Sequence, residues 1–403
     1  MKEKRRLYIA DYCFTPYESI SRCGILCSGE RIIAIGGASA FVKESKVEII
    51  DVSGAYAVPG FIDSHIHGCG GFDSSTAHRS DTDIGVMCRV LSTHGVTSFL
   101  PTVISAPVSE MLAALDALSS MMEKDFPGAQ PVGIHLEGPF LSRAKHGSQR
   151  EDDILSRADT VLADELIAAA KGKIKIFTLA PELPGSLDLI EFLLEKGITP
   201  SMGHSLADET QVLMAVDAGA RRCTHIYNGM PPLHHREVSL TAIALTDDRI
   251  TIEIIVDGRH IHPTMIELAC RIKPKDKIIG VSDAIQGAGL NDGTYQLGAS
   301  QVNVEKGVVT TPDGTMAGTT MTLEQSWEQL VSYSLFENME AAACFTSNPA
   351  KSLGLEDRGE LRPGKRADIA FFEGGTNKNI LTVAKGKIVF DINGKLNDIP
   401  ELT

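Results

Sequence analysis

Residues 57–71 read Ala-Val-Pro-Gly-Phe-Ile-Asp-Ser-His-Ile-His-Gly-Cys-Gly-Gly. The opening half of this stretch is apolar with little alternation, as in a strand buried on both faces, and the closing glycines suit a turn. Side chains on a strand repeat their direction every two residues, so His65 and His67 would lie on the same face. Both imidazoles could then reach one metal ion at the carboxyl end of the strand, where an α/β barrel carries its chemistry.

The chain beyond this stretch continues as apolar runs separated by helical patterns. The seven further candidate strands are 97–102, 133–137, 175–180, 199–204, 222–227, 251–256 and 278–282. Amphipathic or alanine-rich stretches of crossover-helix length lie between them, including 108–123, 162–170, 187–196, 208–218 and 263–273. Eight strand–helix units over about 290 residues predict an α/β fold, a (β/α)8 barrel of the TIM type.

Both ends of the chain have a different sequence pattern, with short β-rich segments separated by turn residues. These pieces are 6–10, 19–27, 31–35 and 47–52 at one end, and 367–372 and 380–389 at the other, after helical segments at 323–335 and 339–345. We expect the two ends to pair in one small β-sandwich side domain, residues 1–58 with 358–403, beside a barrel domain of residues 59–357.

The composition is that of an ordinary globular protein, with 43% hydrophobic residues in a chain of 403. A net charge of −14, from 52 acidic and 38 basic residues, argues against nucleic acid or an anionic membrane as a partner. No apolar run approaches the roughly 18 residues of a membrane span, and no signal-peptide pattern is visible, so we expect a cytoplasmic location. The eight cysteines include no CxxC pair, so neither a disulfide framework nor a cysteine zinc site is expected.

Side chains that can bind metal stand at the ends of five predicted strands. They are His65 and His67 on the first strand, Glu137 on the third, His204 on the fifth, His225 on the sixth and Asp283 on the eighth. Because the strands of a barrel end at one mouth, these side chains would converge there. Such a set of nitrogen and oxygen ligands suits one or two divalent ions, Zn²⁺, Fe²⁺, Mn²⁺ or Co²⁺, without choosing among them.

This ligand set predicts a hydrolytic reaction. A carboxylate between two histidine pairs can bridge two ions, and a bound metal lowers the pKa of water toward roughly 7 and polarises the carbonyl under attack. Asp283 would take a proton from the attacking water and return it to the leaving nitrogen. His135 shares a strand face with Glu137 and is either a partner of the ligands or a packing residue.

Two loops offer candidate substrate contacts. Residues 227–237 follow the sixth strand and include Arg236, whose forked guanidinium suits a phosphate, although a solvated surface arginine is the competing interpretation. Residues 257–260 close the seventh strand, and there His260 either donates to an oxyanion or packs.

Several long motifs occur in a fixed order from about residue 50 to the end. They read PGFIDSHIHG, HLEGPF, GHS, THIYNGMPPLHHRE, VDGRHIHP, SDA with AGLNDGTYQLG, MAGTTMTL, NPAKSLGL and GELRPGKRADI. In this order they resemble the N-acetylglucosamine-6-phosphate deacetylase family of the amidohydrolase superfamily. The resemblance implies a barrel with a β side domain, a homodimer, and hydrolysis of the acetamide of a sugar 6-phosphate to the amino sugar phosphate and acetate.

The resemblance also implies roles for residues at matching positions. Metal ligation falls to Glu137, His204 and His225, with Asp283 catalytic. His65 and His67 match the members that keep this pair, whereas other members replace both and use a single ion, so we expect a binuclear site. The implied substrate residues are Ser148, Gln149, Asn228, Gly229, Arg236, Asp257, His260, Met316, Ala317 and Gly318, and the family arginine matching Arg236 holds the phosphate across the dimer interface.

Three departures from the family pattern bear on the substrate. The chain has Gly147-Ser148-Gln149 where many members have GAH, Gly229 where alanine is usual, and Arg259 inside a DGxH motif. Since a lost histidine and an added cation could change the preferred epimer, N-acetylgalactosamine 6-phosphate stays an alternative substrate.

Two other functions are less favoured. A cyclic-amide hydrolase of the dihydroorotase type usually carboxylates a lysine on the fourth strand, which here ends in Thr178-Leu-Ala-Pro-Glu182 without one. A catalytically inactive sugar-phosphate sensor would be expected to have a broken site, whereas all six candidate ligands are intact.

Overall fold

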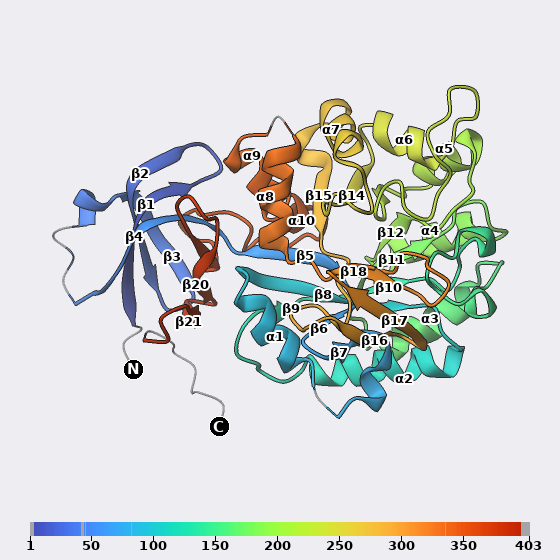
Figure 1. The fold of residues 1–403 in the computed structure, drawn as a ribbon, viewed down its shortest axis with the longest axis horizontal. Coiled ribbons are helices and arrows are strands. Elements are labelled where there is room, and N and C mark those ends of the chain that lie inside the picture. Colours follow the sequence, from blue (N-terminus) through green and yellow to red (C-terminus); the bar gives the residue numbers. More distant parts are fainter. Residues whose placement is uncertain (1–3, 42–43, 45, 82, 335, 396–403) are drawn as a thin grey trace.

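The computed structural model describes residues 4–395, apart from 42, 43, 45, 82 and 335. In this part of the chain eight parallel strands, each followed by a helix, form the predicted barrel (Figure 1). The strand–helix units are β5 (Phe61–Ile66) with α1 (Gly85–Ser92), β8 (Val96–Ile104) with α2 (Val108–Met121), β10 (Ile134–Glu137) with α3 (Thr160–Ala169), β11 (Ile174–Leu179) with α4 (Ser186–Glu195), β12 (Thr199–Met202) with α5 (Glu209–Asp217), β13 (Arg222–Cys223) with α6 (Leu240–Thr246), β14 (Thr251–Ile255) with α7 (Pro263–Ile272), and β15 (Ile278–Val281) with α8 (Leu323–Tyr333).

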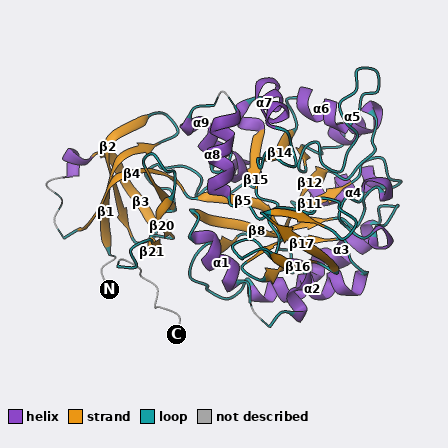
Figure 2. Ribbon diagram, viewed as in Figure 1, coloured by secondary structure: helices purple, strands orange, loops and turns teal. Residues whose placement is uncertain are grey.

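The order of the strands in the barrel follows the chain from β5 to β15. The first and last strands then meet at their carboxyl ends, where the Asp283 N–H donates to the His65 carbonyl at 3.0 Å and the His67 N–H donates to the Ala284 carbonyl at 2.8 Å. Strand β8 is buried along its whole length, as expected for a parallel strand with a packed interior and a covering helix layer. Figure 2 shows the helices arranged outside the strands, so the predicted barrel is confirmed.

The two chain ends build one seven-stranded sheet among the described residues, in the order β21-β20-β19-β4-β1-β2-β3. Its strands are β1 (Arg5–Phe14), β2 (Ser19–Ser28), β3 (Arg31–Gly37), β4 (Glu48–Pro59), β19 (Ile369–Glu373), β20 (Asn379–Ala384) and β21 (Lys387–Asp391). The sheet is curled, so that the Ile32 N–H on β3 donates to the carbonyl of Lys365, which precedes β19, at 2.9 Å. The core enclosed by the curled sheet includes Tyr8 and Phe371. The predicted side domain from both ends is therefore present.

Two details of this sheet differ from the sequence prediction or lie beyond it. The expected strand 380–389 is a hairpin, because Lys385 and Gly386 take positive φ values of 51° and 71° and reverse the chain between β20 and β21. Residues 1–3 and 396–403, which we assigned to the side domain, lie outside the described residues.

Three antiparallel strands that the sequence analysis did not predict are inserted between β15 and α8. They are β16 (Gly293–Leu297), β17 (Ser300–Glu305) and β18 (Val308–Thr310), and we call them the mouth sheet because Leu297 reaches the cavity described below. The turn between the first two strands is anchored by the Gly298 N–H, which donates to the Asp73 carboxylate at 3.0 Å. The Asp73 side chain is buried, so this anchor is shielded from water.

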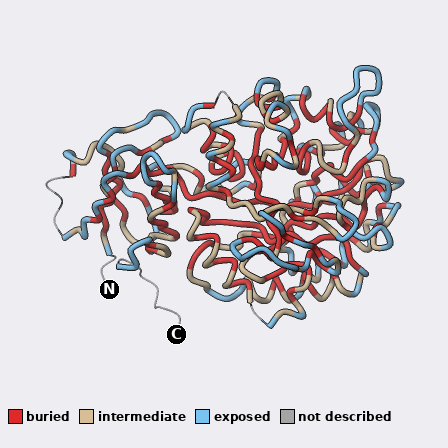
Figure 3. Tube along the Cα trace, viewed as in Figure 1, coloured by how far each residue is buried: buried red, intermediate tan, exposed pale blue. Residues whose placement is uncertain are grey.

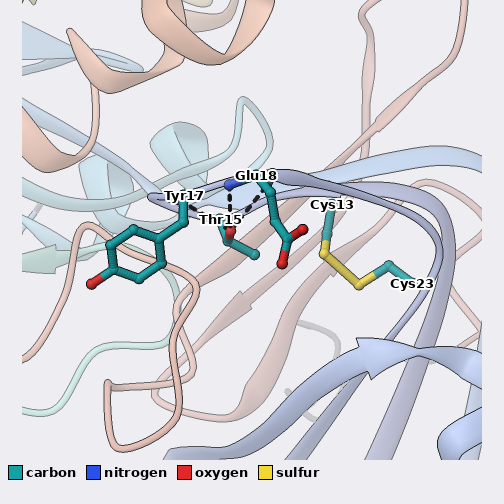
Figure 4. The surroundings of a disulfide bond; sticks show 5 residues. All are labelled: Cys13, Thr15, Tyr17, Glu18 and Cys23. Carbon is teal, nitrogen blue, oxygen red and sulfur yellow. Dashed lines mark hydrogen bonds between the residues drawn. A yellow bond between two sulfur atoms is a disulfide. The ribbon is translucent and has the colours of Figure 1, made fainter.

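One cysteine pair corrects the expectation that the chain has no disulfide. Cys13 and Cys23 form a disulfide across the β1–β2 hairpin, which folds the chain back and brings their Cα atoms to 5.8 Å (Figure 4). The turn beside the disulfide is closed by Thr15, whose hydroxyl donates to the Glu18 carbonyl at 2.9 Å. The other cysteines of the described chain are free and buried, as expected for small apolar residues.

No helix of the described residues has the length and apolar character needed to cross a membrane.

Candidate metal centre and active site

The barrel brings all six predicted ligands to its carboxyl-terminal mouth. His65 and Glu137 lie at the ends of β5 and β10, whereas His67 and three further ligands follow their strands by one or two residues. His204, His225 and Asp283 take positive φ values of 46°, 26° and 50°. This conformation is costly for residues other than glycine, and it commonly persists where the surrounding fold holds a functional group in place. The backbone therefore turns sharply at these three positions.

Glu137 stands between the two histidine pairs. Its Oε1 atom is 3.1 Å from His204 Nε2 and 2.8 Å from His225 Nε2. Its Oε2 atom lies 3.8 Å from His65 Nε2 and 3.6 Å from His67 Nε2. One carboxylate thus offers a separate oxygen to each pair, which is the arrangement needed to bridge two ions.

Asp283 also contacts the first histidine pair. Its Oδ1 atom is 2.9 Å from His67 Nε2 and 3.4 Å from His65 Nε2. Both His65 Nε2 and Asp283 Oδ1 are buried and have no hydrogen-bond partner among the described residues. Buried polar atoms are rarely left without a partner, so a divalent cation fits this cluster.

The charges around the site keep both carboxyl groups ionised. Burial raises the pKa of Glu137, but the electrostatic interaction with His65 and the hydrogen bonds from His204 and His225 outweigh burial and hold the pKa well below its usual value. Burial also opposes ionisation of Asp283, yet the contacts with His67 and His65 lower its pKa. Two carboxylates are therefore available as anionic ligands.

A cavity of about 200 Å³ opens above these ligands. Of the residues that the resemblance assigned to the substrate, seven line it: Ser148, Gln149, Asn228, Gly229, His260, Met316 and Gly318. The cavity wall also contains four residues that we had not assigned to the substrate, Ile104, Gly147, Leu297 and Thr315. Leu297 and Thr315 belong to the mouth sheet and the loop after it, whose position no sequence motif indicated.

Three predicted substrate residues do not line the cavity. Asp257 lies behind His260 and accepts a hydrogen bond from its Nδ1 atom at 2.7 Å, so it orients the imidazole. Ala317 is fully buried between two lining residues. Arg236 lies in an exposed run, residues 232–238, that leads toward α6 (Figure 3). Among the described residues its guanidinium forms a hydrogen bond with His235 only.

His135, for which the sequence left two interpretations open, contacts the ligands without hydrogen bonding to them. Its Nε2 atom is 2.8 Å from the Thr178 hydroxyl, and its ring centroid lies 4.5 Å from that of His65. The sequence analysis missed Glu253 and Arg222, which are buried beneath the site. The available signal was a charged residue inside one apolar strand run, Glu253, and another at the start of the preceding predicted strand, Arg222.

Comparison with known proteins places the chain in a family. Residues 56–395 match the amidohydrolase family. A protein of Escherichia coli O157:H7 named N-acetylgalactosamine-6-phosphate deacetylase is 34% identical over 340 residues, which cover 84% of this chain and 89% of that protein. A Bacillus subtilis protein named N-acetylglucosamine-6-phosphate deacetylase is 36% identical over 337 residues, which cover 83% of this chain and 84% of that protein.

A solved structure agrees with these relatives. The N-acetyl-D-glucosamine-6-phosphate deacetylase of Mycobacterium smegmatis superposes with a TM-score of 0.88 at 29% identity, over 95% of this chain and 100% of that one. The resemblance drawn from the sequence motifs is confirmed. With its barrel, its ligand cluster and these matches, the chain belongs to the amidohydrolase family.

Proposed function

We propose that this protein hydrolyses the acetamide of N-acetylglucosamine 6-phosphate to glucosamine 6-phosphate and acetate. The observation that carries the proposal is the position of Glu137, which offers one oxygen to each of two histidine pairs at the floor of the cavity. Family membership supports an amide-hydrolysing reaction, and the names of the Bacillus and Mycobacterium relatives support the sugar phosphate.

The residues that would hold the metal are Glu137, His204 and His225 for one ion, and His65, His67 and Glu137 for a second. We propose a binuclear site of Zn²⁺, Fe²⁺, Mn²⁺ or Co²⁺, since each oxygen of Glu137 faces its own pair. When bound, the metal supplies an acidic water and polarises the acetamide carbonyl.

Asp283 is the proposed catalytic base and acid. Its ionised carboxylate lines the cavity and can accept the proton of the attacking water. Returning that proton to the amide nitrogen lets the amino sugar leave as a neutral amine. His260, held by Asp257 through Nδ1, has its Nε2 atom free to contact the substrate.

N-acetylgalactosamine 6-phosphate is the second candidate substrate. The Escherichia relative named for this epimer is 34% identical, close to the 36% of the Bacillus relative, so overall identity does not separate the two sugars. The metal ligands and Asp283 act on the acetamide and are indifferent to the 4-hydroxyl group, so the same mechanism serves both epimers.

We further propose a homodimer in which Arg236 holds the phosphate in the partner's site. The support is its exposure outside the cavity of its own chain, where the guanidinium forms a hydrogen bond only with His235 among the described residues. A forked cation with free donors is well suited to a phosphate. The cytoplasmic location expected from the sequence stays a prediction.

The test is Asp283→Asn, assayed by acetate release from both epimeric sugar phosphates, with metal content measured on the same preparation. We expect kcat to fall by about 10²- to 10⁴-fold, because the amide side chain cannot accept the proton. Asp276→Asn, which neutralises an exposed carboxylate just before β15 at the opposite end of the barrel, serves as the matched control. Undiminished acetate release by Asp283→Asn would refute the mechanism, and no release by the wild-type protein would refute the function.

A further inference from the structure

A buried ion pair lies inside the barrel beneath the ligand cluster. Arg222 on β13 and Glu253 on β14 are both fully buried, and the guanidinium Nε donates to Glu253 Oε1 at 2.8 Å. Removing two charges from water costs several kcal/mol per ion, and a pair of this kind often stabilises a protein no more than apolar residues would. Stability alone therefore does not explain why this charged pair is buried beneath the ligands.

The second oxygen of Glu253 contacts the predicted metal ligand His65. Glu253 Oε2 lies 2.9 Å from His65 Nδ1, and because the carboxylate can only accept, Nδ1 must carry the hydrogen. The lone pair of His65 is then left on Nε2, the buried atom without a partner in the described chain that faces Asp283 and Glu137. The same Glu253 oxygen also accepts a hydrogen bond from the backbone N–H of His225, at 3.3 Å.

Arg222 fixes Glu253 from behind through contacts with other elements. Its two terminal nitrogens donate to Ser64 on β5 and to Ser352 on α10 (Ser347–Ser352), each at 2.6 Å. The three donated hydrogen bonds join neighbouring β14, the opening strand of the barrel and a closing helix to one guanidinium. The hydrogen bond from Arg222 holds the Glu253 carboxylate beside His65, and the positive charge of the guanidinium balances the negative charge of the carboxylate.

We propose that Glu253 and Arg222 are positioning residues that set the tautomer and orientation of His65 and thereby hold the ion of the His65–His67 pair. This inference rests on the proposed function, because it concerns the same metal centre. Glu253, His65 and His135 could themselves surround a cation, but Arg222 already supplies the positive charge at Glu253. Glu253 and Arg222 act through His65, so they are neither metal ligands nor, like Asp283, catalytic residues.

The test is Glu253→Gln in the full-length protein, with metal binding as its readout. Chelator-treated protein is titrated with Zn²⁺ or Mn²⁺, and the number of bound equivalents and their affinities are measured. We expect one of the two equivalents to bind roughly 10- to 100-fold less tightly than in the wild type, as is typical when a carboxylate behind a ligating histidine is lost, and the other equivalent to be unchanged. Two equivalents bound as in wild type would overturn the inference, and so would a wild-type protein that binds only one.

Two further variants exclude a simple folding defect. Arg222→Met/Glu253→Gln removes both charges, so no unpaired guanidinium is left in the barrel, and it should show the same selective weakening of one equivalent. Asp368→Asn breaks another buried ion pair, with Arg366 just before β19 of the side domain, and should keep both equivalents. Unaltered binding by the double variant would also overturn the inference.

The two proposals fail separately. If the wild-type protein released no acetate but Glu253→Gln still bound one equivalent less tightly, the proposed function would be wrong and the positioning role would stand. If acetate were released and Glu253→Gln kept both equivalents, only the positioning role would be wrong.

Discussion

At the scale of single residues, the imidazole of His204 is held between two glycines. A Cβ atom added at Gly147 would lie 3.1 Å from His204 Cε1, and one added at Gly229 would lie 2.8 Å from His204 Nδ1. His204 Nδ1 is also hydrogen-bonded to the Lys145 carbonyl at 2.7 Å, which leaves Nε2 directed at Glu137. The loops that carry Gly147 and Gly229 pack so closely on the ring that a methyl group added at either glycine would displace it.

We predict that Gly147→Ala displaces this ring and reduces activity. Gly147 has a φ of +64°, so alanine there would also lose about 1 kcal/mol of free energy of unfolding. Gly172→Ala is the matched control, because Gly172 has a φ of +70° with nothing within 4 Å. Urea unfolding should show similar losses for both variants, whereas kcat/KM for acetate release should fall about 10-fold or more for Gly147→Ala only. Equal kinetics in the two variants would contradict the steric role.

The six ligands could be predicted from the sequence because each stands at a strand end, and strand ends converge in a barrel. The left-handed backbone of His204, His225 and Asp283 could not be predicted, since tertiary contacts impose it on residues that disfavour it. Glu253 escaped notice because its role depends on a contact with His65, 188 residues away in the chain.

At the scale of elements, the loop from β13 to α6 is the part of the site that the proposed homodimer concerns. It begins next to the ligand His225 and carries Arg236 out into solvent. If Arg236 serves its own chain, the loop must fold back over the cavity. If it serves a partner, each active site takes residues from two chains.

We predict that mixed dimers of Arg236→Ala and Asp283→Asn subunits regain activity. One of the two sites in such a dimer has both Asp283 and Arg236, so random assembly should restore about a quarter of the wild-type rate per chain. The measurement is acetate release by co-expressed subunits at low substrate concentration, compared with each variant alone. A mixture of Asp283→Asn with His204→Asn is the control, because these residues contribute to the same site and every mixed dimer has two defective sites. No restoration in the first mixture would place Arg236 in its own subunit's site.

Elements with a repeating pattern were predicted well, and inserted elements were not. All eight predicted barrel strands are present, and most are marked by buried apolar runs, but the sixth, predicted at 222–227, is confined to Arg222–Cys223 because the chain turns at the ligand His225. The mouth sheet has exposed residues along β16 and β17, so it lacks such a run, and its position is set by the distant anchor between Gly298 and Asp73. The hairpin at Lys385-Gly386 was missed for the related reason that a two-residue turn hardly interrupts an apolar stretch.

At the scale of the whole molecule, the side domain and the barrel are joined almost without a linker. β4 ends at Pro59 and β5 begins at Phe61, and the intervening Gly60 donates its N–H to the Asp368 carbonyl at 3.0 Å. A Cβ atom at Gly60 would lie 2.2 Å from the Thr97 side chain, so only glycine fits this junction. The chain ends thus pack directly against the opening strand of the active-site barrel, although the boundaries at 58/59 and 357/358 stay predictions.

The stability of the molecule should also depend on pH through Lys273, which joins two helices of the outer layer. This buried ammonium, just after α7, donates to the carbonyls of Ala244 and Asp247 at 2.8 and 2.6 Å. Burial lowers its pKa from the usual 10.5 to about 8. Between these values the unfolded chain keeps a proton that the folded protein has lost, so this lysine makes the free energy of unfolding rise with pH.

We therefore predict that the difference in free energy of unfolding between wild type and Lys273→Met is constant below about pH 8 and increases in favour of wild type toward pH 10.5. Taking the difference cancels the other groups that titrate in this range. The measurement is urea unfolding at a series of pH values. Lys351→Met, which removes an exposed ammonium paired with Asp276, controls for the change in net charge. A difference that stayed flat, or that fell as the pH rose, would show that Lys273 keeps its proton in the folded protein and that burial does not depress its pKa.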